Sequence, residues 1–161
     1  MRAGLAILIV CVATATLSAS LGPPVDIGTR AKGAERIVVA SVAEIGSSFD
    51  VSSSGDRLIV SHVQLRVEET LKGSAAAALA LTVEGGTVGD LTMRVSDMPT
   101  LQAGQRAVFF LNPASGGYRP HGRGLGILKL DANDRIQGST LTLSDVRNMV
   151  RAAVAPAGGQ R

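Results

Sequence analysis

Residues 57–71 constrain the fold most, because their side chains alternate in character from Ser61 to Glu68. One face carries small or apolar side chains, at Ser61, Val63, Leu65 and Val67. The other face carries polar side chains, at His62, Gln64, Arg66 and Glu68. A period of two residues is that of a β-strand with one face toward a core and one toward water. The stretch is long for a single strand, which predicts a bend or bulge of the kind that barrels need.

Shorter apolar stretches on either side predict the other strands. They cover residues 36–45, 79–84, 107–111, 118–121 and 126–130. Loops are expected at 46–55 and 85–86, an irregular segment or short strand at 87–95, and turns at Asn112-Pro113 and Gly116-Gly117. Many short strands with glycine turns are typical of a small barrel or sandwich. We therefore expect a mainly β fold: a small OB-like barrel of five to six strands over residues 34–139.

The core of this barrel must be aliphatic, because the sequence holds three Phe, one Tyr and no Trp. Residues 107–111, AVFFL, are apolar throughout, which predicts a short, fully buried strand. The side chains expected in the core are Leu65, Val67, Val83, Val108 and Phe110.

The period changes near the C-terminus, where residues 140–155 predict an α-helix. Its apolar residues fall at helical spacing, at Leu143, Val146, Val150 and Val154. Thr142 followed by Asp145 resembles a capping box, and Pro156 marks the end of the helix. We expect the helix to cover one open end or edge of the barrel, with residues 156–161 as a tail.

The first twenty residues have the three-part pattern of a secretory signal peptide. Arg2 precedes an uncharged apolar run, and Ser18-Ala19-Ser20 supplies small residues for cleavage after Ser20, or after Ala19. The alternative, an uncleaved anchor, is disfavoured because the run is shorter than the ~20 residues that span a bilayer. No later stretch predicts a membrane span, so we expect a secreted or periplasmic protein. Residues 21–33, rich in proline and glycine, predict a flexible linker.

Cysteine and charge exclude several function classes. Cys11, the one cysteine, lies inside the signal peptide, which leaves the mature chain without a disulfide, a thiol nucleophile or a cysteine metal site. Val10 before Cys11 disfavours lipidation. The net charge of +3 is scattered along the sequence. With Phe49 and Tyr118 as the candidates for base stacking outside the AVFFL strand, nucleic-acid binding is not expected.

The sequence predicts no catalytic, cofactor-binding or metal-binding residues. The pattern G-x-S-x-G is absent, and the two histidines, His62 and His121, lie far apart in predicted strands. Their simplest interpretation is an exposed strand histidine and a strand-end histidine. Asp131 begins a stretch like a calcium loop, but Arg135 stands where an oxygen ligand belongs, so a polar turn is expected. Glu68 and Glu69 are neighbours in a strand and point to opposite faces, so they cannot share one substrate atom.

The order of these strands and turns resembles a large group of secreted bacterial proteins with no assigned activity, which share the pattern VEExLKG, then Gly-Gly, then GxRxxxFL. The matching residues are Val67, Glu68, Glu69, Leu71, Lys72, Gly73, Gly85, Gly86, Gly89, Gly104, Arg106, Phe110 and Leu111. The order is also loosely similar to the OB-type netrin-like module of tissue inhibitors of metalloproteases, which implies a secreted β-barrel. In those inhibitors an N-terminal cysteine coordinates the zinc of the target, and this sequence has no cysteine after Cys11.

These observations favour an exported, non-enzymatic module that binds an extracytoplasmic protein or an envelope component. The expected contact surfaces are residues 46–55 and 85–99, because loops on a rigid barrel commonly carry binding. The alternatives are a protease-associated or protease-inhibitory module, and an enzyme whose site is not visible in the sequence.

Overall fold

The computed structural model describes residues 26–52 and 54–155. The predicted signal peptide, the tail at 156–161 and the first part of the predicted linker lie outside the described residues. Within the described ranges, no helix has the length and apolar character needed to cross a bilayer.

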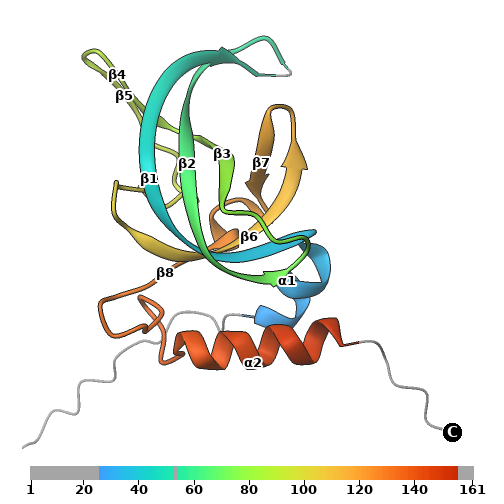
Figure 1. Ribbon diagram of the computed structural model, residues 1–161. Coiled ribbons are helices and arrows are strands. Elements are labelled where there is room, and N and C mark those ends of the chain that lie inside the picture. The colour runs from blue at the N-terminus through green and yellow to red at the C-terminus, as the bar shows by residue number, and fades with distance from the viewer. Residues whose placement is uncertain (1–25, 53, 156–161) are drawn as a thin grey trace, which may run out of the picture.

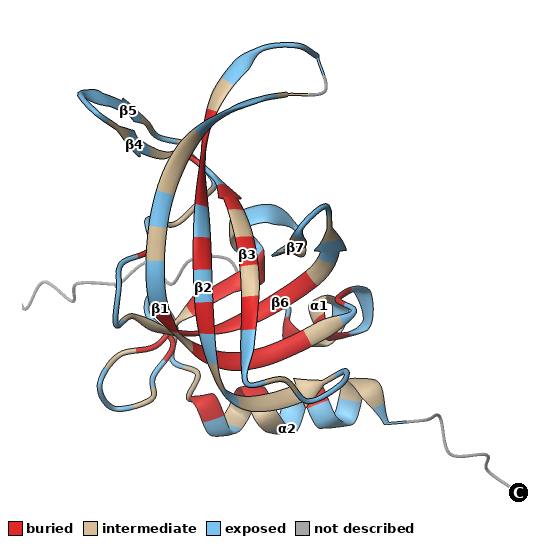
Figure 2. Cartoon of the chain, turned by 45° about the horizontal axis from the view of Figure 1, so that its top comes forward, coloured by how far each residue is buried: buried red, intermediate tan, exposed pale blue. Residues whose placement is uncertain are grey.

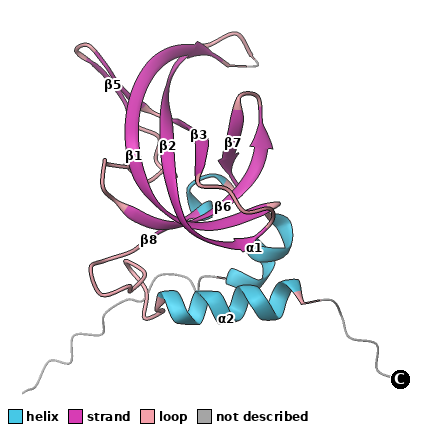
Figure 3. Ribbon diagram, viewed as in Figure 1, coloured by secondary structure: helices cyan, strands magenta, loops and turns pink. Residues whose placement is uncertain are grey.

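Five strands form a ring, as expected for a small OB-like barrel (Figures 1 and 3). They are β1 (Arg36–Val51), β2 (Arg57–Lys72), β3 (Ala78–Glu84), β6 (Arg106–Ala114) and β7 (Gly117–Pro120). The order around the ring is β1-β2-β3-β7-β6, and β6 pairs back with β1. The ring is weakest between β3 and β7, which are parallel and share one register pair, Leu81 with Tyr118.

Three further short strands lie outside this ring. The short strand β8 (Ile127–Lys129) pairs with β6 on the edge opposite β1. The strands β4 (Gly86–Val88) and β5 (Leu91–Met93) form a separate hairpin in the connection from β3 to β6. This hairpin occupies the segment where an irregular stretch or one short strand was expected.

The predicted alternation in β2 is confirmed. Ser61, Val63 and Leu65 are buried and Val67 is half-buried, whereas the four polar side chains of the opposite face are exposed. The expected bend is present as three register shifts in the pairing of β1 with β2. These shifts bend both strands into the long curve seen in Figure 2.

Two cores lie on the two sides of β1 and β6. Val38, Ala40 and Phe109 face the interior of the barrel, together with Leu65 and Leu81. The alternate residues of the same strands face the helices beneath the barrel, and include Ile37, Val39, Val108 and Phe110. A strand covered on both faces needs apolar residues at every position, which explains the AVFFL run. Of the five predicted core residues, Val67 alone is half-buried rather than buried.

The prediction of a flexible linker is wrong for residues 27–33, which form the helix α1 (Ile27–Gly33). Asp26 caps its first turn by accepting a hydrogen bond from the Thr29 N–H at 2.9 Å. At its other end, the Lys72 Nζ atom donates to the carbonyl oxygens of Ala31 at 2.7 Å and Ala34 at 2.6 Å. A helix this short depends on such tertiary contacts, which a local sequence pattern does not reveal.

Two other local predictions are corrected. Residues 46–51 were expected in a loop but continue β1, because they pair in register with residues 57–62 of β2. Asn112-Pro113 was expected to be a turn but belongs to β6, where Pro113 is paired with Tyr118 near the strand end. The stretch after β7 contains the short 3-10 helix η1 (Arg123–Gly126).

The helix α2 (Leu143–Val154) lies beneath the barrel and beside α1, as Figure 1 shows. Its capping box is present: the Thr142 hydroxyl accepts a hydrogen bond from the Asp145 N–H, and the Asp145 carboxylate accepts one from the Thr142 N–H. Leu143, Val146 and Val150 are buried against the barrel. The helix therefore covers the face of β1 and β6 that points away from the barrel interior.

Candidate functional site

A cavity of ≈ 750 Å³ opens beside β1, beyond the point where β6 stops pairing with it. Its walls are residues 45–47 of β1, residues 83–87 at the end of β3 and in β4, and residues 92–96 and 98–101. We name this cavity the edge cleft. It brings together parts of the two segments expected to carry contacts, 46–55 and 85–99. The outer parts of those segments project beyond it as two hairpins (Figure 1).

The buried Ser61 hydroxyl and the half-buried Ser47 hydroxyl contact the chain where it crosses from β3 to the β4–β5 hairpin. The Ser61 side chain is 4% exposed, and its hydroxyl donates to the Gly85 carbonyl oxygen at 2.7 Å. The Ser47 and Ser61 hydroxyl oxygens are 3.0 Å apart, and the Thr87 N–H donates to the Ser47 hydroxyl at 3.4 Å. Gly86, with φ of +146°, packs so closely on both serines that a Cβ atom would lie 2.5 Å from the Ser61 hydroxyl. The floor of the cleft is therefore held in one geometry.

The edge of β1 that borders the cleft has unpaired backbone groups. Val42 still pairs across this edge: its N–H donates to the Gln105 carbonyl oxygen at 2.9 Å, and its own carbonyl accepts from the Gly104 N–H at 2.8 Å. A register shift follows directly after Val42. Beyond it, no described residue pairs with this side of β1.

The direction of these unpaired groups follows from the pairing of β2. The Ile59 carbonyl oxygen accepts a hydrogen bond from the Gly85 N–H at 2.8 Å, so Ile59 directs its backbone groups away from β1. In an antiparallel ladder, two facing residues that exchange no hydrogen bonds both direct their N–H and C=O groups away from each other. Such pairs recur at every second residue. The residues of β1 at these positions are Ile45, Ser47 and Phe49. Their N–H and C=O groups therefore point to the open edge.

The two charged side chains of the cleft differ in whether they form an ion pair. Glu84 and Arg94 are its ionisable side chains. The Glu84 carboxylate accepts a hydrogen bond from Arg123 at 2.7 Å, and the same guanidinium contacts Asp97 at 2.5 Å. These two carboxylates raise the pKa of Arg123, with Asp97 contributing most. Arg94 is exposed, and no described residue forms an ion pair with it. Arg94 is therefore the charged side chain of the cleft that is available to an acidic group of a partner.

The inner wall of the cleft is apolar. Val83 and Leu101 are buried, and the side chains of Ile45, Val95 and Met98 are half-buried. Apolar walls with a few fixed polar groups are typical of binding sites rather than of solvent-filled surface hollows. The arrangement can hold an apolar side chain while offering hydrogen bonds along one edge.

The two histidines are not brought together and do not line the cleft. His62 is exposed on the polar face of β2, and its Nε2 atom is 3.0 Å from the Ser48 hydroxyl. His121 follows β7, and its Nδ1 atom is 3.1 Å from the Asn112 side-chain nitrogen. Both positions agree with the structural interpretations given above. Among residues 26–52 and 54–155, no group of three His, Cys, Asp or Glu side chains is placed to hold a metal ion.

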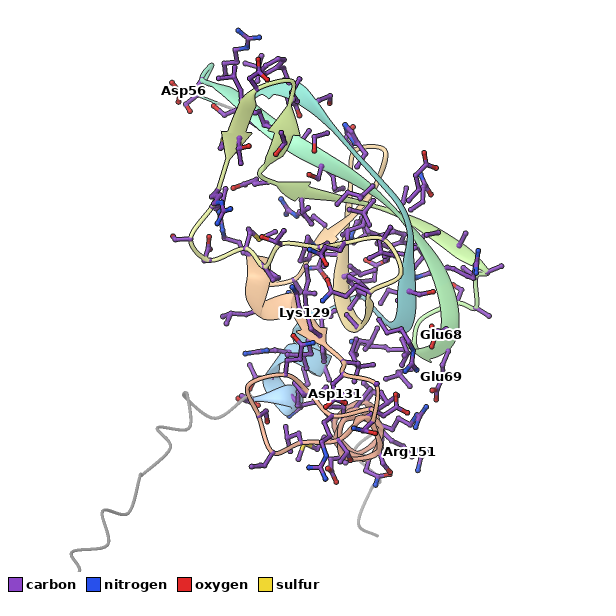
Figure 4. All side chains as sticks on the ribbon, turned by 90° about the vertical axis from the view of Figure 1, so that its left-hand side faces the viewer. Asp56, Glu68, Glu69, Lys129, Asp131 and Arg151 are labelled. Atoms are coloured by element: carbon purple, nitrogen blue, oxygen red, sulfur yellow. The ribbon has the colours of Figure 1, made fainter. Side chains whose placement is uncertain are left out.

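The acidic residues considered as candidates make structural contacts. Glu68 pairs with Arg106 of β6 at 2.9 Å, and Glu69 pairs with Arg147 of α2 at 2.7 Å, so the two carboxylates serve different partners. Figure 4 shows both near the base, far from Asp56 at the tip of the β1–β2 hairpin. The Asp131 carboxylate accepts hydrogen bonds from the backbone N–H groups of Asn133 and Arg135, at 2.8 and 2.9 Å. The expected polar turn is confirmed.

The candidate stacking residues each contact an arginine of the same chain. The Arg57 guanidinium lies 3.8 Å from the centre of the Phe49 ring, and the Arg36 guanidinium lies 5.2 Å from that of Tyr118. The sequence did not identify Ile45, Ser61 or Arg94 as residues of a candidate site. A signal was present for Ser61, which is the one hydroxyl residue on the otherwise apolar face of its strand. Comparison of the sequence with known protein families and with curated proteins finds no match.

Proposed function

We propose that this chain is an exported, non-enzymatic β-barrel module that binds a protein partner outside the cytoplasm through the edge cleft. The observation that carries the proposal is the cleft itself, in which an apolar wall, unpaired backbone groups and a free arginine lie side by side. The predicted signal peptide supports export, and the rigid barrel with two projecting hairpins supports a binding role.

The residue types of the cleft favour binding over catalysis. Of its two ionisable side chains, Glu84 already accepts a hydrogen bond from Arg123, and Arg94 is an exposed cation. Neither has a neighbouring nucleophile and base in the arrangement that covalent catalysis requires. The Ser47 and Ser61 hydroxyls contact each other, and Ser61 donates to the Gly85 carbonyl oxygen; neither contacts a base among the described residues.

The test is an affinity capture from the envelope fraction and culture supernatant of the source organism, with the chain from Leu21 as bait. The cleft variant is Arg94→Glu, and the matched control is Arg151→Glu, an exposed arginine on α2. We expect one protein to be enriched by the wild type and by Arg151→Glu and depleted with Arg94→Glu, and its direct binding to be measured with purified components. No enriched protein, or equal capture by all three baits, would contradict the proposal. If the captured protein is a protease that the chain inhibits, the protease-inhibitory alternative is favoured.

A further inference from the structure

We infer that the occupant of the edge cleft is an extended polypeptide segment, which pairs with the free edge of β1 as an added strand. This segment would place an apolar side chain in the cleft and an acidic side chain beside Arg94. The inference rests on the proposed function and specifies how the partner is recognised.

The first argument is the spacing of the unpaired backbone groups. Ile45, Ser47 and Phe49 turn their N–H and C=O groups outward at every second residue, which is the repeat of a β-strand. A helix has no free backbone groups at this spacing, because its own hydrogen bonds use them. An extended main chain is therefore the ligand that satisfies this edge, as in other domains that bind peptides by strand addition.

The second argument is the position that the added strand would take. At the base, β6 pairs with residues 36–41 of β1, and Gly104 and Gln105 continue the pairing as far as Val42. Beyond Val42 this side of β1 is bordered by the edge cleft. The hairpin β4–β5 packs against β1, and the Thr87 N–H donates to the Ser47 hydroxyl, but the described strands of the hairpin form no backbone ladder with β1. An incoming strand would pair with β1 beyond Val42, in line with β6.

The third argument is the composition of this edge, which from Ile45 to Val51 carries one charged residue, Asp50. Residues 45–51 read IGSSFDV and contain no lysine, arginine or proline. Natural proteins commonly protect exposed edges with such residues, or with a covering segment. An edge without proline or basic residues beside a cavity can accept a partner strand.

The fourth argument concerns the side chains of the partner. Val83 is paired with Ser61 and Ser61 with Ser47, so all three lie in one row across the sheet and line the cleft. A partner residue in the same row can direct its side chain onto the apolar wall. Because Arg123 already binds Glu84, the remaining charge at Arg94 is positive and complements an acidic partner residue.

The experiment selects a phage-displayed library of random peptides on the folded chain from Leu21. The best peptide is synthesised with free backbone amides and with single N-methyl groups along its length. We expect N-methylation at alternate positions to weaken binding about tenfold, because each methyl removes one main-chain hydrogen bond. Positions between them should tolerate the methyl group. Selected peptides should share an apolar residue and a nearby acidic residue.

Matched variants of the protein test the edge itself. Ile45→Pro removes the side chain and the outward N–H, whereas Ile45→Ala removes the side chain alone; proline is tolerated where the N–H faces outward from a sheet. We expect Ile45→Pro to bind at least about threefold more weakly than Ile45→Ala, for the loss of one hydrogen bond. Circular dichroism and thermal unfolding establish that each variant is folded. Arg94→Glu should weaken the peptides that carry the acidic residue and not their alanine versions.

Three outcomes would overturn the inference. They are the absence of any selected peptide, binding that is indifferent to the position of N-methylation, and selected peptides that bind as helices. A partner that is still captured in an Arg94-dependent manner would then leave the proposed function standing. The loss of that capture, by contrast, would remove the proposed function itself.

Discussion

At the base of the barrel, β1 lies between β2 and β6, and Val38, Val39 and Ala40 are fully buried. At the other end of the same strand, β2 is the one paired neighbour, and Phe49 and Val51 are 40% and 65% exposed. The base is held by two apolar cores and two helices. The cleft end shares the inner core through Val83 and Leu101, and it is also held by serine hydroxyls, close glycine contacts and ion pairs.

This difference is consistent with the proposed function, in which the base supplies stability and the cleft end supplies binding. Buried apolar surface supplies most of the free energy of folding, and it is concentrated at the base. Regions with few buried apolar contacts open more readily, and ligand-binding segments are commonly drawn from them. The hairpins beyond the floor of the cleft are therefore expected to open more readily than the base.

The largest effect is expected from Phe110→Ala at the base. Phe110 is fully buried between the barrel and the helices, so its truncation should lower the free energy of unfolding by about 3–5 kcal/mol. Urea denaturation measures this loss. The matched variant at the cleft end, Phe49→Ala, should cost less than about 1 kcal/mol, because it removes a cation–π contact at an exposed site. A loss below about 1 kcal/mol for Phe110→Ala would contradict the core assignment.

The next effect is expected from Gly86→Ala at the floor of the cleft. A Cβ atom there would collide with two serine hydroxyls, and φ of +146° is unfavourable for alanine, so we expect a loss of about 1–3 kcal/mol. Hydrogen exchange should accelerate in β4 and β5 and remain unchanged at the base. Gly46→Ala is the control, because a Cβ atom at Gly46 meets no atom within 4 Å. Uniform acceleration across the barrel would show that the two ends are not independent.

A smaller effect is expected from Ser61→Ala. The change removes the hydrogen bond to the Gly85 carbonyl oxygen and the contact with Ser47, for a loss of about 1 kcal/mol. Ser48→Ala, which removes an exposed contact with His62, should be close to neutral. Denaturation curves of the two variants distinguish a structural buried hydroxyl from a surface one. Equal stability of both variants would argue against the hydroxyl set as a support of the cleft.

The smallest effect is expected in acid, at the helix beneath the base. The Thr142 hydroxyl and N–H donate to the Asp145 carboxylate and hold the pKa of that carboxyl below its usual value. The folded state therefore favours the ionised form, and its stabilisation is complete above the ordinary pKa of about 3.9 and is lost as the pH falls through the lower folded value. Asp145→Asn should lower the Tm near neutral pH, and the difference from wild type should shrink in acid. Asp90→Asn on the β4–β5 hairpin is the control, and a constant difference at all pH values would contradict this account.

The barrel was predictable because its signals are local and repeated. The alternation in β2 and the AVFFL run each identify one strand, and the capping box at Thr142 identifies the start of α2. The helix α1 was not predictable, since it depends on Lys72, which is distant in the sequence. The continuation of β1 to Val51 was missed because its serines and glycine are typical of loops, and pairing with β2 overrides that preference.

The candidate site was predictable only in outline. The two segments expected to carry contacts do border the edge cleft, but their meeting depends on how the chain crosses from β3 to β4. The free edge of β1 results from the end of its pairing with β6, which no local pattern encodes. The unpaired charge of Arg94 likewise follows from the choice of Arg123 as the partner of Glu84.

The two partners of β1 also set an order for folding. The strand β2 follows β1 directly in the sequence, whereas β6 lies beyond the whole of β3, β4 and β5. Closing a longer loop costs more chain entropy, so the β1–β2 hairpin can form early and the docking of β6 must come late. The residues that control the folding rate should then be those where β6 meets β1, and the free edge of β1 would be present before the ring has closed.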